Sequence, residues 1–322
     1  MKFKTIVLGG GISGIICGYY LKDDFCIISD NLGGQLNSNF PLGPRYLHYK
    51  EPTETLLNSL KIDFKREIVN IGYMVQSKVL DQVENNIKLL YFLKSRNVKK
   101  LDPKISEEIK KSCMSEGKNY FEYIDFDMVK LQHLLLSNIE SKSVQQDKIL
   151  KIDYVNRCLF SEDKYYEYEN LICTIPKNVL YYLCGLTDKV ESVFSPVTYV
   201  YTADDEKYVN SDMSSYNYVY FPEKDSRFHR ITKVEKGLVF DFVGEINKAE
   251  AKFYIRDFAS DKDMQITTNK SAQIIKTSVL ADADAIFDPF LKDVGITLVG
   301  RYAKLSHEDK IEDVIQYARN LG

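Results

Sequence analysis

The sequence predicts an α/β protein in which a Rossmann-like dinucleotide-binding domain carries an inserted α+β domain. A glycine cluster near the start of the chain follows a buried strand and opens a helix. Strands alternate with helices near both ends, whereas the middle reads as helices followed by antiparallel strands. The chain has 322 residues, of which 44% are hydrophobic and 28% charged, which fits one large globular domain or two interleaved ones.

The first 30 residues carry the order strand, glycine loop, helix, strand. Residues 3–8 ("FKTIVL") are typical of a buried strand, and residues 25–30 ("FCIISD") of a second one. The segment between them begins with glycines and continues as a short apolar helix. We therefore expect the first part of a nucleotide-binding βαβ unit here.

The glycines Gly9, Gly11 and Gly14 have G-x-G-x-x-G spacing. The first permits a tight turn, the second lets the backbone approach a pyrophosphate, and the third lets helix and strand pack closely. Ile12 and Ser13 begin the helix, whose N-terminal N–H groups attract phosphate. A glycine-rich turn without a ligand is the structural alternative.

The second strand ends on Asp30, 21 residues after the first glycine of the motif. A carboxylate at this position can accept hydrogen bonds from an adenosine ribose. Together with the glycine spacing, this acid favours a bound dinucleotide over an empty turn.

The rest of the chain changes from helical to strand-like periodicity. The helices we expect share an apolar stripe at a spacing of three or four residues, and they cover residues 52–66, 78–98, 106–117, 125–141, 271–287 and a C-terminal stretch from about His307. The strands we expect alternate or run apolar between turn residues, and they cover residues 147–155, 157–162, 164–176, 196–245 and 295–300. Residues 50–142 are therefore expected to be mostly helical.

Composition excludes several function classes. The net charge of −3 does not indicate nucleic-acid binding, and no apolar run reaches the eighteen residues of a membrane span. The glycines that interrupt the first apolar run argue against a signal peptide. The six cysteines form no C-x-x-C pair, which argues against a zinc or disulfide framework and suits a reducing cytoplasm.

The four histidines show no metal-binding spacing. His133 is typical of a packed helix residue, and His229 is expected to face the opposite side of its strand from Arg230. We therefore expect no metal site.

The segment "NLGGQL" after Asp30 resembles the extended fingerprint of the FAD-binding superfamily that includes amine oxidases, protoporphyrinogen oxidase and UDP-galactopyranose mutase. The matching residues follow the acid directly, and they are Asn31, Gly33, Gly34 and Gln35. The resemblance implies FAD rather than NAD, bound by a domain of the GR2 type. We expect residues 1–44, 143–190 and 291–322 to form this FAD-binding domain, and residues 45–142 and 191–290 to form the substrate domain.

The segment "YNYVYFPEKDSRFHR" resembles a stretch of UDP-galactopyranose mutases in which a tyrosine, and an arginine ten residues later, contact the substrate diphosphate. Tyr220 and Arg230 have that spacing. An arginine fork suits phosphate oxygens, and a phenol adds a directional hydrogen bond. The resemblance thus implies a phosphate-bearing substrate, and a strand pair with an exposed arginine is the structural alternative.

The segments "LVGRYAKLSHEDKIEDVIQYA" and "LGPRYLHYKEPTETLLNSLKI" resemble the parts of the mutases beside the flavin. In the first, Gly300, Arg301 and Asp309 match, although Asp309 also suits the first turn of a helix. In the second, His48 matches a residue that lines the flavin face. Arg45 and His307 depart from the family pattern and the chain has no tryptophan, so the fold and the cofactor carry over better than the reaction.

Three functions remain open. The first is a mutase-like flavoenzyme, in which Arg45, His48, Arg301 and His307 act at the flavin N5 face on a nucleotide or nucleotide sugar. The second is a flavin oxidase or dehydrogenase acting on a C–N bond, such as that of a modified nucleotide or base. The third is a flavin-binding protein without catalysis. The partners we expect are a small phosphate-bearing molecule and, among proteins, at most a second copy of this chain.

Overall fold

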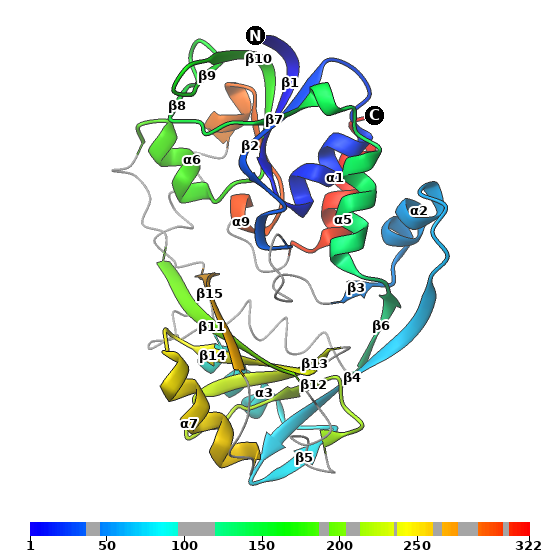
Figure 1. Cartoon of the computed structure of the whole chain (residues 1–322), viewed down its shortest axis with the longest axis vertical. Coiled ribbons are helices and arrows are strands. Elements are labelled where there is room, and N and C mark those ends of the chain that lie inside the picture. The colour runs from blue at the N-terminus through cyan, green and yellow to red at the C-terminus, as the bar shows by residue number, and fades with distance from the viewer. Residues whose placement is uncertain are drawn as a thin grey trace. The chain divides into compact units, whose positions relative to one another are not determined.

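The computed structural model describes residues 1–36, 46–95, 120–186, 193–203, 213–234, 237–259, 266–275, 289–304 and 309–322 (Figure 1). They divide into two compact units. Unit 1 comprises Met1–Arg66, Ile124–Val193 and Lys276–Gly322, and unit 2 comprises Glu67–Tyr123 and Phe194–Ile275. Residues 45–66 and 124–142, which we assigned to the substrate domain from sequence, therefore fall in unit 1. The reason is that their helices pack into the core of that unit.

Unit 1 is built on a sheet with the strand order β7-β2-β1-β10-β9-β8, in which β16 pairs with β10. Its strands are β1 (Lys2–Gly10), β2 (Phe25–Leu32), β7 (Val144–Gln146), β8 (Lys151–Asp153), β9 (Cys158–Phe160), β10 (Tyr165–Cys173) and β16 (Ile296–Leu298). The strands β7, β2, β1, β10 and β16 run parallel, whereas β9 and β8 continue antiparallel. This mainly parallel order confirms the Rossmann-like α/β class.

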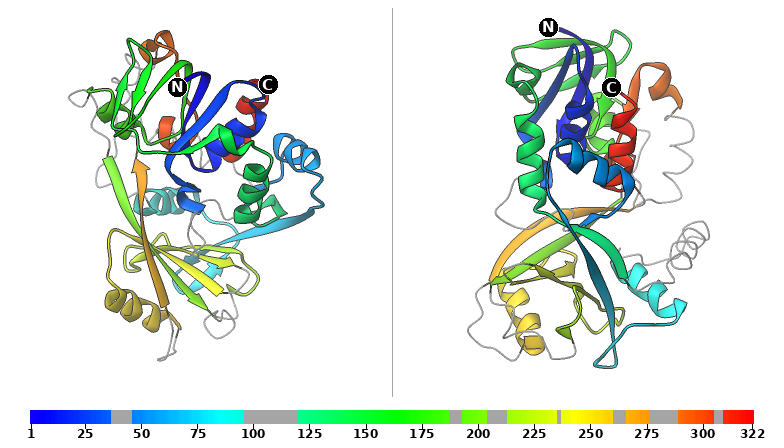
Figure 2. Two further views of the ribbon diagram at one scale, coloured as in Figure 1. Left: turned by 45° about the horizontal axis from the view of Figure 1, so that its top comes forward. Right: turned by 90° about the vertical axis from the view of Figure 1, so that its right-hand side faces the viewer.

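Helices cover the sheet of unit 1. The regular elements are α1 (Ile12–Tyr20), the 3₁₀ turn η1 (Gly34–Leu36), α2 (Glu51–Ser59), α5 (Met128–Ser137), the 3₁₀ turn η2 (Ser141–Ser143), α6 (Lys177–Leu183), α9 (Arg301–Lys304) and α10 (Ile311–Arg319). Helices α1, α5 and α10 lie side by side, as the second view of Figure 2 shows. Alternate residues of each strand face the two sides, so that Val7 and Ile27 join these helices while Ile6 and Ile28 join the opposite cluster.

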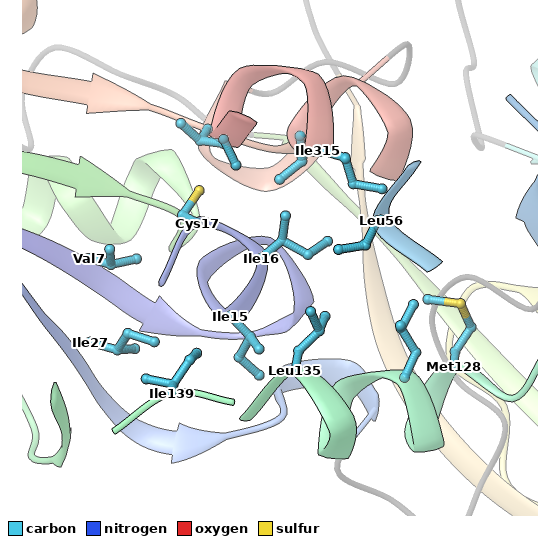
Figure 3. Close-up of a cluster of buried hydrophobic side chains, with 14 of the residues drawn as sticks. Val7, Ile15, Ile16, Cys17, Ile27, Leu56, Met128, Leu135, Ile139 and Ile315 are labelled. Atoms are coloured by element: carbon cyan, nitrogen blue, oxygen red, sulfur yellow. The ribbon is translucent and has the colours of Figure 1, made fainter. Parts of the chain in front are cut away.

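The core beside α1 holds residues from segments far apart in the sequence (Figure 3). Ile16 of α1, Leu56 of α2, Leu135 of α5 and Ile315 of α10 are all fully buried there. Each fully buried aliphatic side chain contributes about 1.5–3 kcal/mol. This packing explains why α2 and α5 belong to unit 1.

Unit 2 contains a mainly antiparallel sheet with the order β15-β11-β14-β13-β12-β4-β6, where β6 is Tyr120–Asp125, and β5 pairs with β4. Its strands and helices are β4 (Lys65–Val75), β5 (Lys78–Leu80), α3 (Asn85–Ser95), β11 (Val193–Ala203), β12 (Tyr218–Tyr220), β13 (Phe228–Val234), β14 (Gly237–Val243), α7 (Lys248–Ala259) and β15 (Ile266–Ile275). One face of this sheet is apolar and packs against α7 through Ala251 and Ile255. The strands expected within residues 196–245 are thereby confirmed.

Among the described residues of 50–142, strands lie between the helices, so the prediction of a mostly helical segment is wrong for this part of the chain. The expected helix over residues 52–66 ends at Ser59, and β4 and β5 follow. The short strand β3 (Leu47–His48) precedes α2, and β6 (Tyr120–Asp125) precedes α5. β-branched and aromatic side chains in β4, such as buried Val69 and Tyr73, favour a half-buried strand over a helix.

Two expected helices near the C-terminus also differ. Residues 271–275 of the helix expected over residues 271–287 belong to β15, and the rest lies outside the described residues. The last helix begins at Ile311 rather than at about His307, which is itself outside the described residues. The helix expected over residues 106–117 also lies outside them. Among the described residues, no helix is long and apolar enough to span a membrane.

Candidate functional site: a glycine cradle and a charged tyrosine row

The glycine loop joins β1 to α1 with very little space for side chains. Gly9 has a φ of +114°, which glycine adopts readily, and the Thr174 hydroxyl lies 3.1 Å from the carbonyl oxygen of Leu8 and 3.2 Å from that of Gly9. A Cβ on Gly14 would lie 1.9 Å from the carbonyl oxygen of Gly9. Gly14 is therefore required for the close approach of α1 to β1, as the sequence predicted.

Gly11 and Gly34 bring two backbone segments together in front of α1. A Cβ on Gly34 would lie 3.0 Å from the Cα of Gly11, and the nearest atom to a Cβ on Gly11 would be the Cα of Gly34 at 3.9 Å. The N–H of Gly33 donates to the carbonyl oxygen of Gly10 at 2.7 Å, which fixes this approach. We refer to residues 9–14 with Gly33 and Gly34 as the glycine cradle.

The glycine cradle presents the N-terminus of α1 without a side-chain cap. Gly11 is the N-cap residue and makes no side-chain hydrogen bond, so the first N–H groups of the helix, including those of Ile12 and Ser13, point toward the cradle. Exposed N–H groups and the helix dipole suit a pyrophosphate. The residues present thus fit the dinucleotide that the sequence implied.

The acid and amide after the cradle are placed at the carboxyl end of β2. Asp30 and Asn31 are both exposed, and their backbone carbonyls accept hydrogen bonds from Gln146 and Ser29. The Asp30 carboxylate is thus accessible to a ribose beside the cradle. Of Gln35 only the backbone is described, in the 3₁₀ turn η1.

The segment that begins at Gly300 lies beside the glycine cradle, at the first turn of α1. Gly300 has a φ of +87°, and a Cβ on it would lie 2.7 Å from the Oγ of Ser13 in the first turn of α1. Arg301 follows at the start of α9 and is exposed. Lys304 at the end of α9 forms an ion pair with Asp309 at 2.8 Å. The structure therefore brings Gly300 and Arg301 to the cradle, and assigns Asp309 a partner in the protein.

His48 belongs to a polar cluster at the start of α10. Its Nδ1 lies 3.4 Å from Oε1 of Glu312, and the Nζ of Lys50 is also 3.4 Å from that oxygen. Burial by itself would raise the pKa of Glu312, but the hydrogen bond from His48 and the charges of His48 and Lys50 outweigh it and lower the pKa to about 2. Glu312 is thus an ionised, buried carboxylate beside the imidazole, and sequence reasoning missed it.

Unit 2 brings Tyr220 and Arg230 together in a row of directly paired residues. Tyr220 pairs with Tyr73 on one side and Arg230 on the other, Arg230 pairs with Asp241, and Asp241 pairs with Tyr199. Residues directly opposite each other share one face of a sheet. We call these five residues the tyrosine row, and it lies on the face opposite α7.

The centre of the tyrosine row is an ion pair. The Nε of Arg230 donates to Oδ2 of Asp241 at 2.7 Å, and Nη2 contacts the same oxygen. The Asp241 side chain is only 1% exposed, and that of Arg230 is 26% exposed. Burial by itself would lower the pKa of Arg230, but the Asp241 carboxylate raises it well above the usual range. The guanidinium that the sequence predicted is therefore present, but its charge is compensated.

Helix α3 covers part of the tyrosine row. The ring of Tyr91 stacks on that of Tyr220 with centroids 4.1 Å apart, and it lies 6.0 Å from the ring of His229. The pairing of β13 with β14 shifts by one residue between Phe228 and Arg230, which marks a β-bulge. The prediction that His229 faces away from Arg230 is therefore wrong, because the bulge interrupts the alternation of side chains.

Two of the predicted catalytic residues, Arg45 and His307, lie outside the described residues. Sequence reasoning missed three residues of the site, namely Tyr91, Asp241 and Glu312. Contacts between distant segments place them there, and no pattern in the local sequence reveals such contacts. Among the described residues, no group of three histidine, cysteine or acidic side chains could hold a metal ion.

Comparison with known proteins identifies the fold. No protein-family model and no curated protein sequence matches the chain. Among solved structures, reduced UDP-galactopyranose mutase is similar with a TM-score of 0.72 and 11% identity, covering 99% of this chain and 94% of that one. Cyclohexylamine oxidase from Brevibacterium oxydans has a TM-score of 0.69 and 12% identity, covering 99% of this chain and 97% of that one.

A putative protoporphyrinogen oxidase from Exiguobacterium is also similar, with a TM-score of 0.66 and 10% identity over 99% of this chain and 97% of that one. These likenesses extend over both units. The chain therefore shares its fold with these proteins, as the resemblance in its sequence implied.

Proposed function

We propose that the chain is an FAD-dependent enzyme. The observation that carries this proposal is the glycine cradle, in which Gly11 and Gly34 leave room beside the uncapped N-terminus of α1. The fold likeness to a mutase, a protoporphyrinogen oxidase and an amine oxidase supports it. The intact cradle argues against a protein that keeps this fold but no longer binds a dinucleotide.

The residues of unit 1 would hold FAD at three points. The cradle would bind the pyrophosphate, and the exposed carboxylate of Asp30 would accept hydrogen bonds from the ribose. Gly300 and Arg301, beside Ser13, would face the flavin end. When bound, the flavin would supply electron transfer or a nucleophilic N5.

Each unit carries polar side chains that suit a substrate. The guanidinium of Arg230 and the phenol of Tyr220 would hold an anionic group, such as the phosphate of a nucleotide or nucleotide sugar. His48 would exchange a proton, with Glu312 fixing its ring through Nδ1. The cytoplasmic location and the pairing with a second copy stay predictions from sequence.

Oxidation of a C–N bond is the second candidate. The observation that favours it is the Arg230–Asp241 pair, because a compensated guanidinium attracts a phosphate less strongly than an isolated one. The likeness to cyclohexylamine oxidase is consistent with this candidate.

The test begins with an absorbance spectrum of the purified protein, which should show bound flavin. Gly11→Ala places a methyl group in the space proposed for the pyrophosphate. Because its Cβ would lie 3.9 Å from the nearest atom, we expect an intact fold and an FAD affinity lower by about tenfold or more. A colourless protein that takes up no FAD would contradict the proposal.

Anaerobic addition of UDP-galactopyranose then separates the two candidates. A mutase-like enzyme should isomerise the sugar only after reduction by dithionite. An amine oxidase should do nothing with the sugar, and an amine substrate should bleach its flavin until oxygen is admitted.

A further inference from the structure

The tyrosine row places one cation and one anion at the same point of the sheet. Arg230 lies in β13 and Asp241 directly opposite in β14, so the pair is built into the strand register. The remaining members of the row, Tyr73, Tyr199 and Tyr220, carry no charge at neutral pH. The row as a whole is therefore neutral.

The contacts of Arg230 show which part of the guanidinium is engaged. Nε and Nη2 both contact Oδ2 of Asp241, so one side of the fork is used inside the protein. The hydrogens on Nη1 and the second hydrogen on Nη2 belong to the other side. The ring of Tyr218 lies 5.1 Å from the guanidinium carbon and covers one of its faces.

The geometry points to Asp241 as the residue that limits the affinity of the tyrosine row for anions and thereby determines substrate specificity. This inference rests on the proposed function, because it takes Tyr220 and Arg230 as the substrate site. An anionic group that contacts the free side of Arg230 would be attracted by the guanidinium and repelled by the buried carboxylate behind it. Since that carboxylate is almost fully buried, solvent screens the repulsion only weakly.

The tyrosine row should therefore distinguish between ligands by their hydrogen bonds more than by their charge. A singly charged or uncharged polar group would satisfy the other edge of the guanidinium without an excess of negative charge. A group with several negative charges would lose part of its electrostatic advantage. Removal of the Asp241 charge should convert the row into a stronger anion site.

The experiment measures the binding of inorganic pyrophosphate to the FAD-loaded full chain by titration calorimetry. Bound FAD keeps pyrophosphate out of the glycine cradle. Asp241→Asn keeps the size of the side chain and removes its charge, and it should bind pyrophosphate about tenfold more tightly than the wild type. Asp163→Asn, on an exposed loop of unit 1, makes the same change in net charge and should leave the affinity at the wild-type value.

Unchanged or weaker binding by Asp241→Asn would overturn the inference, as would the absence of binding in both proteins. If Asp241→Asn does not fold, the double variant Arg230→Gln/Asp241→Asn removes both charges and provides the test. Its affinity should stay within about threefold of the wild type, because the lost attraction of Arg230 is offset by the lost repulsion of Asp241, and the amides of the new side chains still donate hydrogen bonds. A loss of more than tenfold would show that Asp241 imposes no such limit.

A yellow protein with unchanged affinities would refute this inference alone. A protein that binds no flavin would refute the proposed function instead.

Discussion

The glycine cradle of unit 1 is formed by backbone atoms, whereas the tyrosine row of unit 2 is formed by side chains. The cradle consists of backbone, because a Cβ on Gly14 would collide with the carbonyl oxygen of Gly9, and a Cβ on Gly9 with the Thr174 hydroxyl. The row consists of side chains, and its centre is the Arg230–Asp241 ion pair. A backbone site should thus fail sterically when it is changed, whereas a side-chain site should fail electrostatically.

The largest effect is expected in the cradle. In Gly14→Ala the new Cβ would lie 1.9 Å from the carbonyl oxygen of Gly9, so α1 must move away from β1. We expect a loss of about 3 kcal/mol or more in the free energy of unfolding, measured by urea denaturation. Gly11→Ala in the same loop is the control, and in flavin-free protein it should change this free energy by less than about 1 kcal/mol. Equal effects of the two changes would contradict the steric explanation.

The ion pair should give the next largest effect. Arg230→Gln removes the cation that is paired with the almost fully buried Asp241 carboxylate. We expect the free energy of unfolding to fall by about 3 kcal/mol, measured by urea denaturation. Arg66→Gln is a matched control, because Arg66 is 55% exposed and pairs with Glu54 at 3.3 Å, and it should cost less than about 1 kcal/mol. A similar loss in both variants would mean that Asp241 is not held by Arg230.

The two sites also differ in how far the sequence predicts them. The spacing of Gly9, Gly11 and Gly14 is local and could be read from the sequence, although only Gly14 has its steric reason within the same loop. The neighbours of Gly9 and Gly11 are Thr174 and Gly34, which the fold brings in from other segments. Tyr220 and Arg230 were found from their own segment. Asp241 was not found, because only the register of β13 against β14 places it beside Arg230.

The same distinction explains two further errors. Strict alternation predicts that His229 faces away from Arg230, but a bulge in β13 changes the side on which it lies. The segment that forms β4 was included in a region expected to be mostly helical, since a short apolar run without its pairing partners is ambiguous between helix and strand. In both places tertiary pairing determines the result.

The cluster of His48, Lys50 and Glu312 provides a further test of this comparison. Its dependence on pH shows whether electrostatic sensitivity is a property of unit 2 or of any site built from side chains. This cluster belongs to unit 1, yet it is built from side chains. The pKa of Glu312 is lowered to about 2, against an ordinary value of 4.5. A carboxyl group with a lowered pKa stabilises the folded state fully above its ordinary pKa, and this contribution is lost as the pH falls toward 2.

Glu312→Gln should therefore be less stable than the wild type by about 2 kcal/mol at pH 6, and the difference should shrink steadily between pH 4.5 and pH 2. Urea denaturation of both proteins across this range provides the measurement. A difference that stays constant from pH 6 to pH 3 would mean that packing, and not the charge of Glu312, stabilises the start of α10. A shrinking difference would show that side-chain sites in both units depend on a buried carboxylate with a cationic partner, so that the contrast with the cradle is one of chemistry and not of domain.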